Sequence, residues 1–86
     1  MRFVDEPTQV EARFNVKGVP LPRTFTWQGR RLRVTGLGRQ WEKEGEAGLA
    51  HHFLVMIAGG DRFELVQHAG TGCWRVVRAW ERSPLV

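Results

Sequence analysis

Hydrophobic and polar positions alternate with a period of two along most of this chain, which predicts β-strands rather than helices. The segment QVEARFN, residues 9–15, is an example, with apolar side chains on either side of Glu11 and Arg13. The best helical segment, residues 39–52, contains two glycines and has no sustained apolar stripe, so a helix is disfavoured there. The pattern therefore indicates an all-β fold.

The segment TFTWQGRRLRV, residues 24–34, predicts a β-hairpin with a two-residue turn at Gln28-Gly29. Directly paired residues of such a hairpin lie on the same face. Its apolar side chains therefore gather on the core side, and Arg31 and Arg33 gather with two threonines on the other side. The predicted pairs are Trp27–Arg30, Phe25–Leu32 and Arg23–Val34. In this register Arg30 falls on the apolar face at the hairpin tip, where its guanidinium group could lie over the Trp27 ring.

Glycines interrupt the alternation after this hairpin. A β-bulge at Gly36 would reset the alternation and place Leu37 and Trp41 in the core together with two other tryptophans. The acidic segment EKEGEAG, residues 42–48, follows as a predicted loop. Residues 16–23, which contain two prolines, form an earlier predicted loop because proline donates no ladder hydrogen bond.

Residues 51–81 predict three more strands. A three-residue loop over residues 59–61 places Phe53, Val55 and Ile57 on the same face as Phe63 and Leu65. A two-residue loop would place Leu54 and Met56 there instead, and the first alternative gives the cleaner apolar face. A four-residue loop over residues 69–72 then pairs Leu65 with Val76 and Gln67 with Trp74.

These elements add up to about six antiparallel strands in meander order. We expect them to form a small, partly open SH3-like barrel or a strongly curled sheet, which protects the strand edges. The 86 residues fit one β domain, residues 1–86, in which residues 1–8 are either flexible or cover the sheet. The predicted register leaves five apolar residues on the reverse face, namely Leu54, Met56, Val66, Val77 and Ala79. That surface should be covered by curling, by the N-terminal segment or by a partner.

The charge balance is positive. Thirteen Lys and Arg face nine Asp and Glu, for a net charge of +4, and nearly all of the cations are arginines. The arginine fork binds phosphate bidentately and stacks on aromatic rings, although arginine-rich codon usage would give the same composition. The single cysteine excludes an intramolecular disulfide, and no apolar run approaches the roughly 20 residues that cross a bilayer. We therefore expect a cytoplasmic protein without a membrane partner.

Catalytic and metal-binding constellations are missing from the sequence. Cys73 lies across a predicted turn from His68, but no acid is placed to orient the imidazole, and a buried packing thiol is the favoured interpretation. Zinc requires about four ligands at suitable spacing, and adjacent His51 and His52 point to opposite sides of a strand. The sequence also lacks a glycine-rich phosphate loop between a strand and a helix. We expect no enzymatic activity and no cofactor or metal.

Two binding hypotheses remain. Arginines on a rigid sheet beside aromatic rings suit single-stranded nucleic acid, and the candidate residues are Arg13, Arg30, Arg31, Arg33, Arg39 and Arg75. A solvated face partly neutralised by Glu11 and Glu64 is the alternative interpretation of these charges. The second hypothesis is a protein adaptor, or a homodimer, that uses a strand edge or the apolar reverse face; a monomer and a homodimer both remain open. Its candidate residues are Leu54, Met56, Val66, Val77 and Trp80.

Three motifs resemble a known family. The first is an aromatic-x-Trp-x-Gly-Arg segment, formed by Phe25, Trp27, Gly29 and Arg30. The second is a tryptophan near the end of the following strand, Trp41. The third is a closing hairpin formed by Phe63, Leu65, Trp74, Val76 and Arg78. Over roughly residues 8–82 the chain resembles the bacterial domain-of-unknown-function family 6504.

The resemblance implies a small bacterial cytoplasmic protein with no assigned activity. Genes of this family often lie beside those of error-prone, Y-family-type DNA polymerases. The resemblance therefore implies a role in the DNA damage response or translesion synthesis, with such a polymerase or a related protein as the partner. It transfers no site residues.

Overall fold

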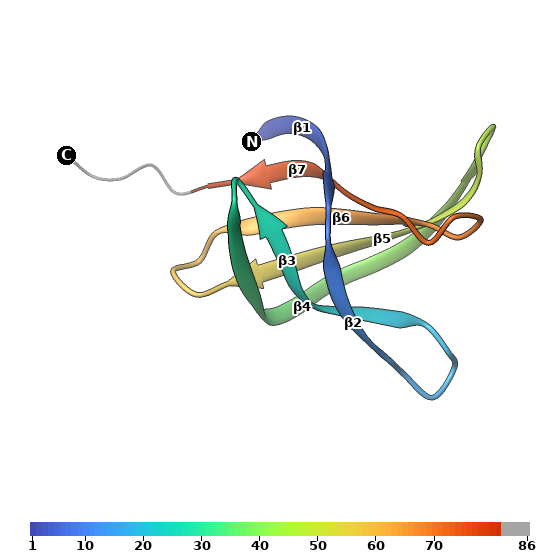
Figure 1. The fold of residues 1–86 in the computed structure, drawn as a ribbon, viewed down its shortest axis with the longest axis horizontal. Coiled ribbons are helices and arrows are strands. Elements are labelled where there is room, and N and C mark those ends of the chain that lie inside the picture. Colours follow the sequence, from blue (N-terminus) through green and yellow to red (C-terminus); the bar gives the residue numbers. More distant parts are fainter. Residues whose placement is uncertain (82–86) are drawn as a thin grey trace.

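The computed structural model describes residues 1–81, which form seven β-strands and no helix (Figure 1). The strands are β1 (Arg2–Thr8), β2 (Val10–Phe14), β3 (Pro20–Trp27), β4 (Arg30–Gly45), β5 (Gly48–Ile57), β6 (Arg62–His68) and β7 (Trp74–Trp80). No helix that could span a membrane occurs among these residues. The two segments predicted as loops are partly strand, since β3 begins at Pro20 and β4 runs on to Gly45.

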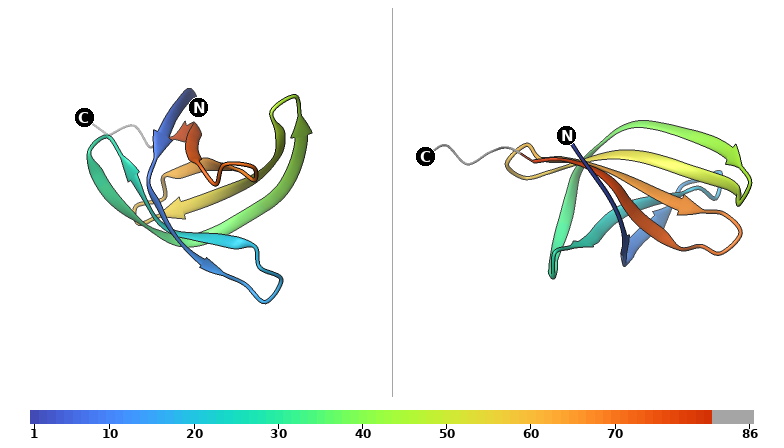
Figure 2. Two further views of the ribbon diagram at one scale, coloured as in Figure 1. Left: turned by 45° about the vertical axis from the view of Figure 1, so that its right-hand side comes forward. Right: turned by 90° about the horizontal axis from the view of Figure 1, so that it is seen from above.

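The strands form one antiparallel sheet in the order β1-β7-β6-β5-β4-β3-β2. The sheet is curled and is not closed into a barrel (Figure 2). The predicted all-β, antiparallel, curled architecture is confirmed, and strands β2 to β7 follow the predicted meander order. The seventh strand is β1, the segment expected either to be flexible or to cover the sheet, which pairs with β7 at one edge.

Strands β1 and β2 lie at opposite edges of the sheet although only Gln9 separates them in sequence. Three hydrogen bonds to Thr26 of β3 hold this junction. The Thr8 Oγ1 hydroxyl donates to the Thr26 carbonyl at 2.7 Å, and the Thr26 amide approaches the Gln9 carbonyl at 3.1 Å and Thr8 Oγ1 at 2.9 Å. The two edges are therefore brought together at one point, without a ladder that would close the sheet.

The β3–β4 hairpin has the predicted two-residue turn and register. Gln28 and Gly29 both have positive φ, 49° and 76°, as a type I′ turn requires. Two of the three predicted pairs are confirmed, Trp27–Arg30 and Phe25–Leu32. The guanidinium group that lies over the Trp27 ring belongs to Arg2, at 5.6 Å from the ring centroid, and not to Arg30 as predicted.

The third predicted pair, Arg23–Val34, is wrong because β3 contains a bulge. Glu11 of β2 pairs with Thr24 and Ala12 pairs with Pro22, so that Arg23 has no direct partner. The extra residue reverses the alternation, which buries Pro22 and exposes Arg23. Counted from the turn, the pairing of β3 with β4 ends one pair before the predicted one, at Thr24–Arg33.

Strand β4 contains two bulges, of which the sequence predicted one. The first lies between Val34 and Gly36, as expected, and Leu37 is then opposite Val55 on the core side. Leu37 is nevertheless 38% exposed, so the prediction that it lies in the core is wrong. The second lies between Leu37 and Gln40 and reverses the alternation again, so that Trp41 pairs with His52 on the opposite face. The prediction that Trp41 lies in the core is therefore wrong.

The faces predicted for strands β5 to β7 are largely correct. Phe53 and Val55 share a face with Phe63 and Leu65, although the pairs Val55–Phe63 and Phe53–Leu65 are shifted by two residues from the predicted register. The predicted pairs Leu65–Val76 and Gln67–Trp74 are confirmed. A bulge beside Leu65 leaves Val77 unpaired.

That bulge changes the face of the sheet on which the side chains at the end of β7 lie. It turns Ala79 into the core, where the residue is 1% exposed, and the prediction that Ala79 lies on the reverse face is wrong.

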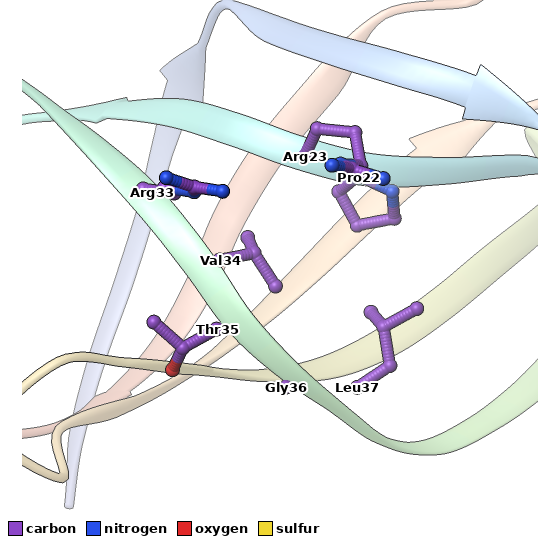
Figure 3. A pocket seen from close by; sticks show the side chains of 7 residues that line it. All are labelled: Pro22, Arg23, Arg33, Val34, Thr35, Gly36 and Leu37. Carbon is purple, nitrogen blue, oxygen red and sulfur yellow. The ribbon is translucent and has the colours of Figure 1, made fainter.

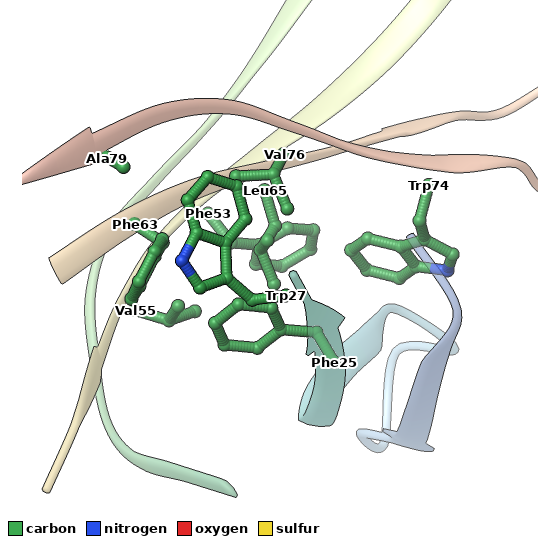
Figure 4. Close-up of a cluster of buried hydrophobic side chains, with 9 residues drawn as sticks. All are labelled: Phe25, Trp27, Phe53, Val55, Phe63, Leu65, Trp74, Val76 and Ala79. Carbon is green, nitrogen blue, oxygen red and sulfur yellow. The ribbon is translucent and has the colours of Figure 1, made fainter. Parts of the chain in front are cut away.

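The core lies between the β3 strand and the inner face of β5, β6 and β7 (Figure 4). The Phe63 ring is in edge contact with Phe25 and Trp27, with centroid distances of 5.1 and 5.3 Å. These contacts attach the β3–β4 hairpin to the rest of the sheet. The buried cluster consists of Phe25, Trp27, Phe53, Val55, Phe63, Leu65, Trp74, Val76 and Ala79.

Candidate nucleic-acid interface

The reverse face of β4, β5, β6, β7 and β1 carries arginine and aromatic side chains on neighbouring strands. Directly paired residues share a face, and the register places three rows of side chains across this one. The rows are Met56–Arg62–Trp80, Leu54–Glu64–Arg78–Phe3 and Trp41–His52–Val66–Arg75. With Arg39, which lies over Trp41, these residues form what we call the arginine–aromatic face.

Three guanidinium groups of this face each lie over an aromatic ring. Arg39 is 5.2 Å from the Trp41 ring centroid and Arg62 is 5.8 Å from that of Trp80. Arg78 is 5.6 Å from the Phe3 ring, whose side chain is otherwise largely in solvent, at 77% exposed. Such contacts are typical of cation–π pairs. The face therefore presents cations and flat apolar surfaces side by side.

Glu64 lies at the centre of the face and is only 2% exposed. Its Oε2 atom is 2.8 Å from Nδ1 of His52, and its Oε1 atom is 2.8 Å from Nε of Arg78. The contact with Arg78 is an ion pair without hydrogen-bond geometry, and Oε1 has no hydrogen-bond partner within residues 1–81. Glu64 thus holds two side chains of the arginine–aromatic face. The solvated-face interpretation expected it to neutralise part of the candidate arginine set, but among residues 1–81 its ion-pair partners are His52 and Arg78, which are not in that set.

The remaining arginine of the face is held by Asp5. Nε of Arg75 lies 2.6 Å from Asp5 Oδ1, and the same guanidinium group donates to the Asp5 carbonyl at 2.6 Å. Asp5 has a φ of 53° and stands at a bulge in β1. Two of the four arginines on this face therefore have acidic partners, whereas Arg39 and Arg62 have none within the described part of the chain.

A pocket of about 310 Å³ opens on the same side of the sheet. It lies between the turn of the β4–β5 hairpin, which bends up beyond β6 and β7 (Figure 1), and strands β6, β7 and β1. Its lining residues are Asp5, Lys43, Gly45, Glu46, Ala47, Gly48, Ala50, His52, Val66, His68, Arg75 and Val77.

The arginines predicted on the β3–β4 hairpin lie elsewhere. Arg31 is exposed but pairs with Glu11 at 2.5 Å, as the solvated-face interpretation expected. Arg33 is exposed and borders a second, larger groove of about 560 Å³ together with Arg23. In Figure 3 these two arginines come from the two strands that separate at the groove, β3 and β4. Arg13 and Arg30 are also exposed and lie outside the arginine–aromatic face.

The apolar residues predicted to bind a partner do not form a bare surface. Val66 is buried, at 4% exposed, and Leu54, Val77 and Trp80 are partly buried. Met56 alone among the five is substantially exposed, at 43%. Four of the five residues are therefore already at least partly covered within residues 1–81.

Cys73 and His68 are neighbours across the β6–β7 turn, where the His68 amide donates to the Cys73 carbonyl at 3.0 Å. Cys73 is exposed, so the interpretation of a buried thiol is wrong. His51 and His52 contact different acids, Glu42 at 3.4 Å and Glu64 at 2.8 Å. No group of three metal-ligating side chains is found within residues 1–81.

The fold and this face define a class, a small open-sheet β domain with one arginine–aromatic surface. The chain belongs to the family described as Domain of unknown function (DUF6504), whose model matches residues 1–81. No curated protein and no solved structure matches the chain.

Proposed function

We propose that this domain binds single-stranded nucleic acid through the arginine–aromatic face, as a non-enzymatic accessory module. The observation that carries the proposal is the placement of three guanidinium groups over three aromatic rings on one sheet face. Single strands are bound by such combinations, because phosphates are held electrostatically while bases stack on side-chain rings. An arginine that lies over a ring in the free protein can move to a phosphate and leave the ring to a base.

The composition of the face favours a single strand over a duplex. Stacking on a side-chain ring requires that the base be splayed out of a helix. Each base stacked on an aromatic side chain is worth about 1–3 kcal/mol. The gene neighbourhood implied by the family resemblance supports the same class of ligand, because error-prone polymerases work on exposed template strands. We place the domain in that context, in the cytoplasm and with such a polymerase or a related protein nearby.

The proposal is tested by fluorescence anisotropy with labelled single-stranded DNA at 50 and 200 mM salt. Three or four phosphate contacts predict that affinity falls about 20- to 50-fold between these conditions, because counterions are released from the strand. The double variant Arg39→Ala/Arg62→Ala should bind more weakly and should reduce the slope of log K against log salt by about 1.4.

A matched control removes the same charge from another surface. Arg13→Ala/Arg30→Ala deletes two exposed arginines that lie off the arginine–aromatic face. We expect it to keep nearly all of the affinity. Equal losses in the two double variants would show diffuse electrostatic attraction and would contradict a defined site, as would the absence of binding at 50 mM salt.

A protein-adaptor function is the second candidate, and the groove between β3 and β4 favours it. Two arginines without an ion-pair partner among residues 1–81, Arg23 and Arg33, stand over a lining that includes Pro22, Val34 and Leu37. An extended acidic segment of a partner protein would match these charges. A partner that survives nuclease treatment in a pull-down, and is lost with Arg23→Ala/Arg33→Ala, would support this function.

A further inference from the structure

The pocket beside the arginine–aromatic face has an apolar floor. Ala50 of β5 and Val66 of β6 are buried, and Val77 of β7 is partly buried beside them. Its volume of about 310 Å³ is at the small end of the range for sites that enclose a small molecule. The pocket therefore has room for one compact apolar body.

The rim of the pocket is polar but balanced in formal charge. Lys43 and Arg75 are opposed by Asp5 and Glu46, and His68 adds a ring that can donate or accept a hydrogen bond. Arg75 is already engaged by Asp5 at 2.6 Å. A phosphate would gain little in such a rim. A flat neutral group whose edge carries donors and acceptors would match both the rim and the floor.

His52 joins the pocket to the rest of the face. Its ring lines the pocket and also stacks on Trp41, with a centroid distance of 5.0 Å and an interplanar angle of 16°. The Glu64 carboxylate, 2.8 Å from Nδ1, holds the ring in this position. Only the His52 ring therefore separates Trp41 from the pocket. A strand with a base stacked near Trp41 would pass close to the mouth of the pocket.

We infer that this pocket takes one unstacked nucleobase of the bound strand. The inference rests on the proposed function, in which the neighbouring arginines hold the phosphates. The apolar floor receives the face of the base, and the mixed rim contacts its polar edge. The site therefore gives the domain a base-dependent contribution to affinity that the backbone contacts alone would not supply.

The test is an NMR titration that compares two single strands of equal length and charge, one with bases and one fully abasic. With the base-containing strand, ring currents should shift the methyl signals of Ala50, Val66 and Val77. With the abasic strand these methyl signals should not shift, although the signals of Arg39 and Arg62 should respond to both strands. Shifts at the arginines with no base-dependent shift of the three methyls would overturn the inference and leave the proposed function standing. No response to either strand would overturn both.

The second test measures the binding affinity of variants in which a larger side chain fills the pocket. Ala50→Leu should weaken binding of the base-containing strand about fivefold or more, the loss expected for one stacked base, and should leave the abasic strand unaffected. The control is Ala58→Leu, the same change at an exposed turn away from the pocket. Val77→Phe fills the pocket from another strand and gives the same expectation if Ala50→Leu fails to fold. Unchanged affinity in a folded filled variant would contradict the inference.

Discussion

His52 and Glu64 are joined across β5 and β6 with 2.8 Å between Nδ1 and Oε2, at a position where the carboxylate is 2% exposed. The contact lies on the face of the sheet opposite the core, where a buried acid is unusual. The burial of its charge is compensated in part by Arg78, whose Nε lies 2.8 Å from the other carboxylate oxygen. The carboxylate therefore ties the histidine of the pocket to an arginine of the proposed interface.

This arrangement predicts that Glu64→Gln destabilises the protein. The substitution keeps the shape but removes the charge that Arg78 and His52 face, so we expect the free energy of unfolding to fall by about 1–3 kcal/mol. Arg78 can still reach water, which keeps the loss below that of a fully buried broken pair. Urea denaturation measures the effect, and a midpoint equal to that of the wild type would contradict the structural role of the carboxylate.

In the turn of the β3–β4 hairpin, replacing a glycine should lower the free energy of unfolding through backbone conformation alone. Gly29 has a φ of +76°, and nothing lies within 4 Å of the position where a Cβ would stand. Gly29→Ala should therefore cost about 1–2 kcal/mol from the left-handed conformation alone. Gly45 is equally open but has no positive φ, so Gly45→Ala is the matched control and should change stability by much less. Comparable losses in thermal unfolding would show that the strain argument is wrong.

The alternation of hydrophobic and polar positions predicted which residues face the core wherever the strand pairing is regular. The Phe25–Leu32 and Leu65–Val76 pairs followed from the pattern and from turn length. The same reasoning failed at or directly after each unpredicted bulge, because one extra residue reverses the alternation of the side chains that follow it. Arg23, Trp41 and Ala79 are the three residues misplaced in this way.

The candidate site could be predicted only in part for the same reason. Arg39 and Arg75 were named from the sequence, but the aromatic partners of the face depend on register between distant strands. Arg62 lies over Trp80, and Arg78 lies over Phe3, although these residues are far apart in the sequence and no local pattern connects them. The local signal that was present is the Arg39-x-Trp41 spacing, which becomes meaningful once the second bulge of β4 is known.

Substitution of Trp41 tests how much base stacking contributes to the proposed binding of single-stranded DNA. Because its ring lies on the arginine–aromatic face against His52, Trp41→Ala should reduce the affinity for single-stranded DNA by about 1–3 kcal/mol. Phe14→Ala removes another aromatic side chain, one that is exposed on β2 and away from this face, and should leave binding unchanged. Anisotropy titrations at one salt concentration compare the two variants. A Trp41→Ala protein that binds as tightly as the wild type would exclude this ring as a stacking platform.

Ala79 provides a test of the β7 bulge itself. The regular pattern would place this residue on the reverse face, where a larger side chain would be tolerated. The structure instead places it 1% exposed in the core beside Phe63, its partner in β6. Ala79→Leu should therefore overpack the core and lower the free energy of unfolding by about 1–3 kcal/mol.

Val77→Leu is the matched comparison, since Val77 is the bulged residue and is only partly buried on the other face. We expect it to change stability by less than Ala79→Leu in the same urea titration. The reverse order would mean that β7 runs without the bulge. Arg78 would then face the interior, and one of the three arginine–ring contacts on which the proposed interface depends would be lost.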